Sequence, residues 1–297
     1  MKAGRPEGVL VSGDWLAANL GAEDLRVVDV RGKVLPPGND PRYIPKRQDY
    51  DAGHLPGAVF VDWTRDIVDP EDPVPIQVAR PEAFAAKMTE LGVGDGTLVV
   101  AYDDYNHAFA GRLAWALRFY GHEDVRILDG GWSRWVGEGR PTTREPSPTG
   151  KAPRPFTARE RLGLRRTADQ VQHALGDPGV LLIDARAPAQ YEGTVTVAAR
   201  GGHIPGARNV HYAQLVDATS GNFLPREELA RVFLQAGVDP QLPREIVVYC
   251  NGGVTCTVPL AALHMLGRED AAVYDGSWNE WGNDPGRPIE TVRQPKA

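Results

Sequence analysis

Short apolar runs alternate with longer stretches of helical periodicity along the chain. In the first half, residues 27–30, 98–102 and 125–128 are apolar runs of strand length. Residues 81–91 and 109–120 lie between them and carry apolar side chains at helical spacing. We therefore expect three buried strands and two helices in this half. Strands that alternate with helices predict an α/β fold, a mainly parallel sheet with helices on both faces.

The second half follows the same pattern. Pro225 suits the first turn of one expected helix, and Gly237 and Gly267 suit the ends of two helices. The expected strands are 180–183, 245–249 and 271–274, and the expected helices are 225–236 and about 255–266.

Two short motifs occur once in each half. The motif Gly-His-(Leu/Ile)-Pro-Gly-Ala occupies residues 53–58 and 202–207, and Asp-Gly-(Gly/Ser)-Trp occupies 129–132 and 275–278. The motifs keep the same order, and a chain of 297 residues has room for two domains of about 150 residues each. We therefore expect two tandem copies of one domain.

A proline-rich segment separates the copies. Residues 140–166 contain five prolines and no periodic apolar pattern, which is typical of an extended connector. We expect an N-terminal domain at 1–141, a linker at 142–166 and a C-terminal domain at 167–297. The connector is basic, but we interpret it as a solvated linker rather than a nucleic-acid site because the whole chain is acidic.

Composition and charge narrow the classes of function. Hydrophobic residues make up 42% of the chain and charged residues 24%, which excludes a disordered chain. The formal charge at pH 7 is -6, so no global positive field draws in nucleic acid or an anionic membrane. The chain has no apolar run of about 20 residues and its start lacks a secretory signal, so we expect a cytoplasmic protein.

The chain has two cysteines, Cys250 and Cys256, too few for a disulfide framework and wrongly spaced for structural zinc. Cys250 follows the expected strand 245–249, and a tight loop with two glycines leads from it into the next helix. Such a loop turns main-chain N–H groups inward, and a helix N-terminus adds positive potential. We therefore expect a thiolate nucleophile at Cys250; the alternative is a small buried residue. The loop residues expected to bind the substrate are Asn251, Gly252, Gly253, Val254 and Thr255.

The first copy lacks this thiol. When Tyr102 is aligned with Tyr249, Asp103 falls opposite Cys250, and the residues after Asp103 contain no glycine pair. We therefore expect the reactive loop in the second copy alone.

Three sequence features together resemble the tandem-domain rhodanese-like sulfurtransferases, a family of thiosulfate and 3-mercaptopyruvate sulfurtransferases. They are the repeated Gly-His-(Leu/Ile)-Pro-Gly-Ala motif, the Tyr-Asp-Gly-Ser-Trp-Asn-Glu-Trp segment at 274–281 and the loop Cys-x-x-Gly-Val-Thr at 250–255. The resemblance implies a non-catalytic N-terminal domain, a C-terminal domain whose Cys250 forms a persulfide, and an active site in the cleft between them. It further implies a small anionic sulfur donor, cyanide or a dithiol such as thioredoxin as acceptor, and no cofactor or metal.

The resemblance also assigns Arg186, which follows the first strand of the second domain, to the anionic donor. A planar fork of N–H donors suits sulfonate or carboxylate oxygens. The alternative is a structural ion pair with Asp184 or Glu192, and Arg31 stands at the equivalent place in the first copy.

Four other polar side chains have alternative roles. His54 and His203 lie in the twin motifs, so we expect both to satisfy backbone groups rather than to catalyse. Thr255 is expected either to donate its hydroxyl to the sulfur or to cap the following helix. Cys256 is expected to be a small packed residue, with a resolving thiol as the alternative.

Two places in the sequence concern the identity of the sulfur donor: the loop after Cys250 and the position of Gln190. Family members that use thiosulfate carry basic residues after the cysteine, and this loop has none. Members that use 3-mercaptopyruvate carry a second arginine at the position of Gln190. Because Gln190 removes a partner for a carboxylate, we expect thiosulfate, with 3-mercaptopyruvate and then a non-catalytic sulfur carrier as alternatives.

Two further expectations concern reaction class and assembly. Phosphoryl transfer is not expected, because phosphatases of this fold need an arginine where the chain has Cys256. We expect a monomer with no nucleic-acid or membrane partner, because the duplication already supplies both walls of the cleft.

Overall fold

This computed structural model describes residues 2–147, 152 and 154–292. The chain folds into two compact units, and each contains a five-stranded sheet whose neighbouring strands are all parallel. The first unit comprises Met1–Pro70, Val78–Arg161 and Asp217–Phe223, and the second comprises Glu71–Gln77, Leu162–Val216 and Leu224–Ala297.

The first sheet has the strand order β1-β7-β6-β2-β5. A short antiparallel ribbon, β3 (Gly32–Val34) with β4 (Tyr43–Pro45), follows β2 in the chain. The sheet strands are β1 (Leu10–Val11), β2 (Leu25–Asp29), β5 (Val59–Phe60), β6 (Leu98–Tyr102) and β7 (Val125–Leu128). The helices are α1 (Gly13–Asn19), α2 (Arg47–Ala52), α3 (Pro81–Glu90), α4 (Ala108–Phe119) and α5 (Gly131–Gly137).

Both faces of the first sheet are buried. On one face, Val100 and Tyr102 of β6 pack with Leu16 of α1 and Trp135 of α5 in a single hydrophobic cluster. On the other, α4 contacts β6 and β7, and every residue of α4 except Arg118 is buried. All five side chains of β6 are buried for this reason, which explains why that strand reads as a continuous apolar run.

The second sheet has the order β10-β9-β11-β12-β8, so β11 lies in the middle as β6 does in the first. Its strands are β8 (Arg165–Arg166), β9 (Val180–Asp184), β10 (Arg208–Asn209), β11 (Glu245–Tyr249) and β12 (Ala272–Tyr274). The helices are α6 (Ala168–His173), α7 (Pro188–Tyr191), α8 (Arg226–Gln235), α9 (Thr257–Met265) and α10 (Ser277–Trp281), with 3-10 turns η1 (Leu162–Leu164) and η2 (Tyr212–Leu215).

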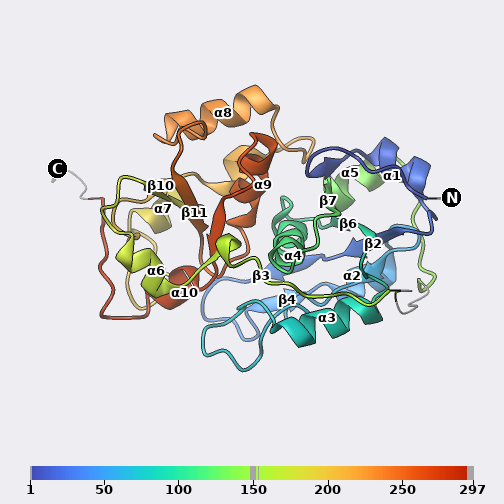
Figure 1. The fold of residues 1–297 in the computed structure, drawn as a ribbon, viewed down its shortest axis with the longest axis horizontal. Coiled ribbons are helices and arrows are strands. Elements are labelled where there is room, and N and C mark those ends of the chain that lie inside the picture. Colours follow the sequence, from blue (N-terminus) through green and yellow to red (C-terminus); the bar gives the residue numbers. More distant parts are fainter. Residues whose placement is uncertain (1, 148–151, 153, 293–297) are drawn as a thin grey trace. The chain divides into compact units, whose positions relative to one another are not determined.

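Helices cover both faces of the second sheet as well. Val247 and Tyr249 of β11 pack with Val171 of α6 and with Trp278 and Trp281 of α10. The helix α9 contacts β11 and β12, and Figure 1 shows it on the other side of β11 from α6. The α/β class with two parallel sheets is therefore confirmed.

The expected central elements agree closely with the structure. Strands 98–102, 125–128 and 245–249 have the predicted bounds, and each of the other expected elements differs by one or two residues at its ends. Gly237 and Gly267 follow α8 and α9 with φ of 75° and 92°, the left-handed conformation that ends a helix. Strands β1, β5, β8 and β10 were not predicted, because two residues carry no periodicity.

The predicted linker, 142–166, is only partly described. Residues 148–151 and 153 lie outside the described part of the chain. At its end, Arg165 and Arg166 form β8, so the second sheet begins before the predicted boundary. The domain boundaries themselves stay a prediction.

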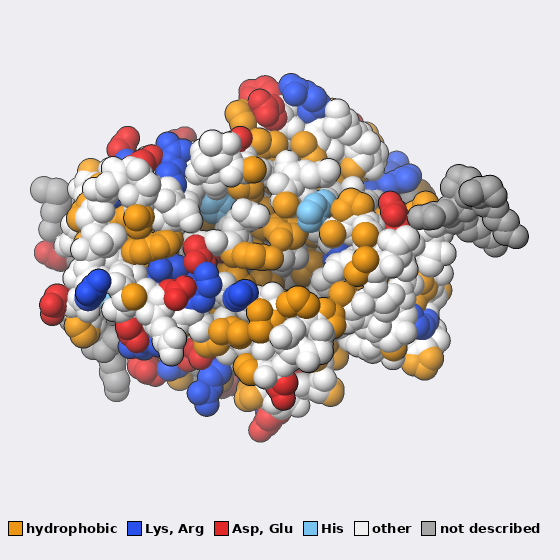
Figure 2. All heavy atoms as spheres, turned by 180° about the vertical axis from the view of Figure 1, so that it is seen from behind, with side chains coloured by type: hydrophobic (Ala, Val, Ile, Leu, Met, Phe, Trp, Pro, Cys, Tyr) orange, Lys and Arg blue, Asp and Glu red, His pale blue; other side chains and the backbone are white. Residues whose placement is uncertain are grey.

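Two structural observations concern membrane and nucleic-acid partners. No helix in the described ranges is long and apolar enough to cross a membrane. On the face drawn in Figure 2, acidic and basic side chains lie side by side rather than in a basic stripe.

Candidate active site

Cys250 lies at the carboxyl end of the middle strand of the second sheet. It directly follows Tyr249, the last residue of β11, and the chain turns through residues 251–256 before α9 begins. Gly253 takes φ of 72°, a left-handed conformation that glycine adopts without strain. The side chain of Cys250 is buried, with 1% of the residue exposed. The carboxyl edge of a parallel sheet is where ligands usually bind in such folds.

Hydrogen bonds around the sulfur favour the thiolate. Burial by itself would raise the pKa of the Cys250 thiol, because a charge is costly away from water. Hydrogen bonds from the side chains of Cys256 and Thr255, and from the main-chain N–H groups of Cys256 and Gly252, lower that pKa to about 5. At neutral pH the thiol is therefore ionised, and a thiolate is the nucleophilic form of cysteine.

The remaining loop residues hold the turn in shape. Asn251 donates from Nδ2 to Gln190 Oε1 at 3.1 Å. The carbonyl oxygen of Val254 accepts the hydroxyl of Thr257 at 2.7 Å. Of the five residues expected to bind the substrate, Gly252 and Thr255 donate hydrogen bonds to the sulfur of Cys250. The hydroxyl of Thr255 therefore acts as a donor to the sulfur rather than as a helix cap.

The segment after β12 braces this loop. Because β12 is the parallel neighbour of β11, the two strands end at the same edge of the sheet. Trp278 N–H donates to the carbonyl oxygen of Cys250 at 3.0 Å, and Asn279 N–H donates to that of Asn251 at 2.7 Å. The hydroxyl of Ser277 also contacts the loop. The repetition of the Asp-Gly-(Gly/Ser)-Trp motif after equivalent strands is the sequence signal for this brace, although the motif by itself does not reveal the role.

The first copy carries a carboxylate where the second carries the thiol. Asp103 directly follows β6, and Trp132 N–H donates to its carbonyl oxygen at 2.8 Å, as Trp278 does to Cys250. The side chain of Asp103 is buried and accepts four main-chain N–H groups at 2.8–3.1 Å, from Tyr105, His107, Phe109 and Ala110. The first loop is thus filled by the Asp103 carboxyl group, whose pKa burial raises to about 6, and it holds no thiol.

Comparison with known proteins agrees with this geometry. The family model described as "Rhodanese-like domain" matches residues 12–138 and 167–284. The chain belongs to the tandem rhodanese-like sulfurtransferase family. Its class of reaction is therefore sulfur transfer.

Three relatives illustrate the range of this family. "Thiosulfate/3-mercaptopyruvate sulfurtransferase 1, mitochondrial" of Arabidopsis thaliana is 35% identical over 95% of this chain and 78% of its own. "Sulfur carrier protein TtuD" of Thermus thermophilus is 36% identical over 95% of this chain and 96% of its own. The crystal structure of SseA from Escherichia coli, described under 3-mercaptopyruvate sulfotransferases, has a TM-score of 0.80 and 34% identity, and covers 91% of this chain and 99% of its own.

The histidines of the twin motifs are structural in both rhodanese-like domains, as expected. His54 Nδ1 lies 2.9 Å from the carbonyl oxygen of Tyr50, and its ring stacks on that tyrosine. His203 Nδ1 lies 2.8 Å from the carbonyl oxygen of Tyr191 and stacks in the same way. Each histidine therefore satisfies a backbone carbonyl of its own domain.

Arg186 forms a buried ion pair in the second rhodanese-like domain. Its guanidinium bonds to both carboxylate oxygens of Asp184 at 2.6–3.1 Å and to the carbonyl oxygen of Gly202 at 2.7 Å, and it lies over the ring of Trp278. Only 2% of the residue is exposed. The geometry supports the structural ion pair with Asp184, and because the Cys250 sulfur is among the groups that raise the pKa of this guanidinium, the contact of Arg186 with the donor stays a prediction.

Arg31 confirms this interpretation from the first rhodanese-like domain. It bonds to Asp29 at 2.8–3.2 Å and to the carbonyl oxygen of Gly53, and it lies over the ring of Trp132. The same arrangement therefore occurs in a domain without the nucleophile, so it serves the fold of each copy.

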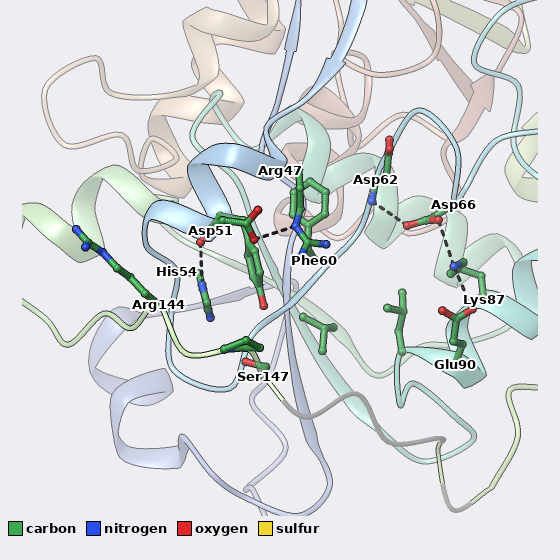
Figure 3. Close-up of a pocket in the computed structure, with 14 residues that line it drawn as sticks. Arg47, Asp51, His54, Phe60, Asp62, Asp66, Lys87, Glu90, Arg144 and Ser147 are labelled. Atoms are coloured by element: carbon green, nitrogen blue, oxygen red, sulfur yellow. Dashed lines mark hydrogen bonds and ion pairs between the residues drawn. The ribbon is translucent and has the colours of Figure 1, made fainter.

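A polar pocket of about 460 Å³ in the first domain does not suit an anionic donor (Figure 3). Two of its cations are paired with carboxylates: Arg47 lies 2.9 Å from Asp51, and Lys87 lies 3.4 and 3.0 Å from Asp66 and Glu90. Neither cysteine lines this pocket. Among the residues that the structure describes, no group of three or more His, Cys, Asp or Glu side chains is placed to hold a metal ion.

Proposed function

We propose that this sulfurtransferase moves a sulfane sulfur from thiosulfate to cyanide or a dithiol through a persulfide on Cys250. The observation that carries the proposal is the buried thiol of Cys250, whose pKa is lowered to about 5 by hydrogen bonds from its own loop. The first copy supports it, because there Asp103 fills the equivalent loop and leaves no sulfur to react.

The first half of the reaction loads the enzyme. The thiolate of Cys250 attacks the outer sulfur of thiosulfate, a bond forms between the two sulfurs, and the sulfur–sulfur bond of the donor breaks. The bonding electrons leave with sulfite, and the enzyme keeps one sulfur atom as a persulfide anion. No proton, electron or cofactor is needed for this step, which is nucleophilic displacement by an activated cysteine.

The second half of the reaction transfers the persulfide sulfur from the enzyme to an acceptor. Cyanide attacks the terminal sulfur, leaves as thiocyanate, and returns the electrons of the sulfur–sulfur bond to Cys250 as thiolate. A dithiol such as thioredoxin accepts the same sulfur through one thiol and expels it as sulfide when the second thiol closes a disulfide. The donors that hold the thiolate, the Gly252 and Cys256 N–H groups and the Thr255 hydroxyl, are suited to hold the persulfide anion in the same loop.

Thiosulfate is the proposed donor because the chain lacks, at the expected position, the second arginine fork that would bind the carboxylate of 3-mercaptopyruvate. Gln190 occupies that position, and its Oε1 accepts a hydrogen bond from Nδ2 of Asn251. Arg186 is committed to Asp184. The alternative donor is 3-mercaptopyruvate, which the description of the E. coli structure names and the name of the Arabidopsis relative gives beside thiosulfate.

A sulfur carrier is the second candidate function. The Thermus thermophilus relative bears that name at 36% identity. A carrier would accept sulfur on Cys250 by the same chemistry, but would pass it to a protein partner rather than turn over with small acceptors. We propose the enzyme as the main function, acting as a monomer without a cofactor or metal.

The test compares the purified protein with Cys250→Ser and, as a control that loses a thiol but keeps the nucleophile, Cys256→Ser. Incubation with thiosulfate is expected to add the mass of one sulfur atom to the native protein and to Cys256→Ser, and none to Cys250→Ser. Thiocyanate production from thiosulfate and cyanide should follow the same order. Absence of both sulfur loading and thiocyanate from the native protein contradicts the proposal.

Two further measurements separate the alternatives. Side-by-side kcat/KM values for thiosulfate and 3-mercaptopyruvate decide the donor. Stoichiometric loading without thiocyanate production favours the carrier.

A further inference from the structure

Ser277 has an unusual backbone conformation for a serine. Its φ is 52°, in the left-handed region that side chains with a Cβ rarely adopt, and the residue is fully buried. Such a conformation persists only where the surrounding structure requires it, and it is frequent at functional sites. The residue opens α10, shortly after β12, the strand that neighbours β11.

The Ser277 hydroxyl bonds to two points of the Cys250 loop. It accepts the main-chain N–H of Cys250 at 3.2 Å and that of Gly253 at 3.1 Å. Its own hydrogen goes to the carbonyl oxygen of Tyr274 at 2.8 Å, which turns the oxygen lone pairs toward the loop. One oxygen atom therefore ties together the first and fourth residues of the turn.

The first copy offers a comparison within the same chain. Gly131 occupies the position of Ser277, with nearly the same φ of 53°. A Cβ on Gly131 would lie 2.3 Å from the carbonyl oxygen of Asp103, so the first copy has no room for a serine there. Its loop is organised instead by the Asp103 carboxylate. The serine thus occurs in the copy that has the thiol.

We infer that Ser277 is a positioning residue for the nucleophile: its hydroxyl fixes the main chain at Cys250 and Gly253 so that the other donors of the loop face the sulfur. By accepting these two N–H groups, Ser277 sets the curvature of the turn. The Gly252 and Cys256 N–H groups and the Thr255 hydroxyl then converge on the thiolate. Ser277 acts through the loop. This inference rests on the proposed function in one respect: the thiol that Ser277 positions, that of Cys250, is the one proposed to react.

Two substitutions separate the hydroxyl from the backbone conformation. Ser277→Gly removes the hydroxyl and relieves the strain, and glycine is the residue that the first copy uses at this position. Ser277→Ala removes the hydroxyl and keeps the strain. If the hydroxyl positions the loop, both variants are expected to lose about tenfold to a hundredfold in kcat for thiocyanate formation, with the KM for thiosulfate within about twofold of the native value. Ser277→Thr, which keeps a hydroxyl, is expected to recover part of the loss.

A second readout does not depend on sulfur transfer. The ultraviolet absorbance of the Cys250 thiolate, titrated against pH, is expected to show a midpoint about one unit higher in Ser277→Gly and Ser277→Ala than in the native protein. Tyr191→Phe is the control, because it removes a hydroxyl bonded to the carbonyl oxygen of Ala207 elsewhere in the same unit and should leave the midpoint unchanged.

The outcomes are distinct. A Ser277→Gly variant that matches the native protein in both kcat and thiolate midpoint overturns the inference, since the serine would then serve only the chain conformation. If the native protein transfers no sulfur at all, the proposed function fails, and the midpoints still decide whether Ser277 organises the loop.

Discussion

Asp103 and Cys250 occupy the same position in the two copies of the fold. Each follows the middle strand of its sheet, and the carbonyl oxygen of each accepts a tryptophan N–H, at 2.8 Å from Trp132 and 3.0 Å from Trp278. Both side chains are buried among main-chain donors. The two loops therefore surround an acidic group by the same means, but burial raises the pKa of the Asp103 carboxyl to about 6, whereas hydrogen bonds lower that of the Cys250 thiol to about 5.

The first prediction concerns the stability of the loop that Asp103 fills. Asp103→Asn replaces one carboxylate oxygen by an NH₂ group, which then faces main-chain N–H donors and leaves at least one of them unsatisfied. We expect the free energy of unfolding to fall by about 2–4 kcal/mol. Denaturant unfolding followed by circular dichroism measures this.

Asp51→Asn is the matched control. Asp51 is exposed and pairs with Arg47 one helical turn away, so its loss should change the free energy of unfolding by less than about 0.5 kcal/mol. Equal effects of the two substitutions would contradict a structural role for the Asp103 carboxylate.

The second prediction is the pH dependence of the Cys250 thiol. Burial opposes ionisation, but the hydrogen bonds of the loop outweigh it and lower the pKa to about 5. The thiolate absorbance of the native protein, after subtraction of Cys250→Ser, should therefore rise with a midpoint near pH 5 and be complete at neutral pH. A midpoint near the ordinary cysteine value of about 8.5 would exclude an activated nucleophile.

The same titration predicts a change in stability. A thiol with a lowered pKa in the folded chain contributes stability that is complete above its unfolded pKa, about 8.5, and is lost as the pH falls to about 5. The difference in unfolding free energy between the native protein and Cys250→Ser should therefore grow between pH 5 and pH 8. A constant difference over this range would count against the lowered pKa.

The third prediction assigns a role to Cys256. Cys256 is fully buried, and its thiol donates a hydrogen bond to the sulfur of Cys250. Cys256→Ala should raise the midpoint of the Cys250 titration by about one unit, and Cys256→Ser should restore it because a hydroxyl also donates. If Cys256 is only a packed residue, Cys256→Ala will change the melting temperature and leave the midpoint of Cys250 where it was.

The sequence contained most of the fold because the central strands are buried on both faces. A strand such as 98–102 or 245–249 then becomes a continuous apolar run with clear ends, and its bounds can be predicted to the residue. The edge strands consist of two residues each, and their positions depend on pairing with β7, β2, β12 and β9, which no local pattern encodes.

The site was predictable where it depends on local chain geometry and less so where it depends on tertiary contacts. Cys250 at a strand end, before a glycine-rich turn and a helix, signals a thiolate by itself. The contribution of Ser277 becomes visible only when two strand ends meet at one edge. The Arg186–Asp184 ion pair also had a sequence signal, since Asp29 precedes Arg31 by the same two residues as Asp184 precedes Arg186.

The last prediction tests that pair of arginines against each other. Lysine keeps the charge of Arg186 or Arg31 but cannot reach two carboxylate oxygens and a backbone carbonyl at once. Arg186→Lys and Arg31→Lys should therefore each lower the free energy of unfolding by about 2–4 kcal/mol, and neither should change the KM for thiosulfate more than about twofold. An arginine that binds the donor gives a different result: Arg186→Lys then raises this KM about tenfold while Arg31→Lys leaves it unchanged. Because the two arginines have matching bonds in the two copies, Arg31→Lys controls for the loss of the ion pair, and any further change in KM reports what Arg186 adds at the site of Cys250.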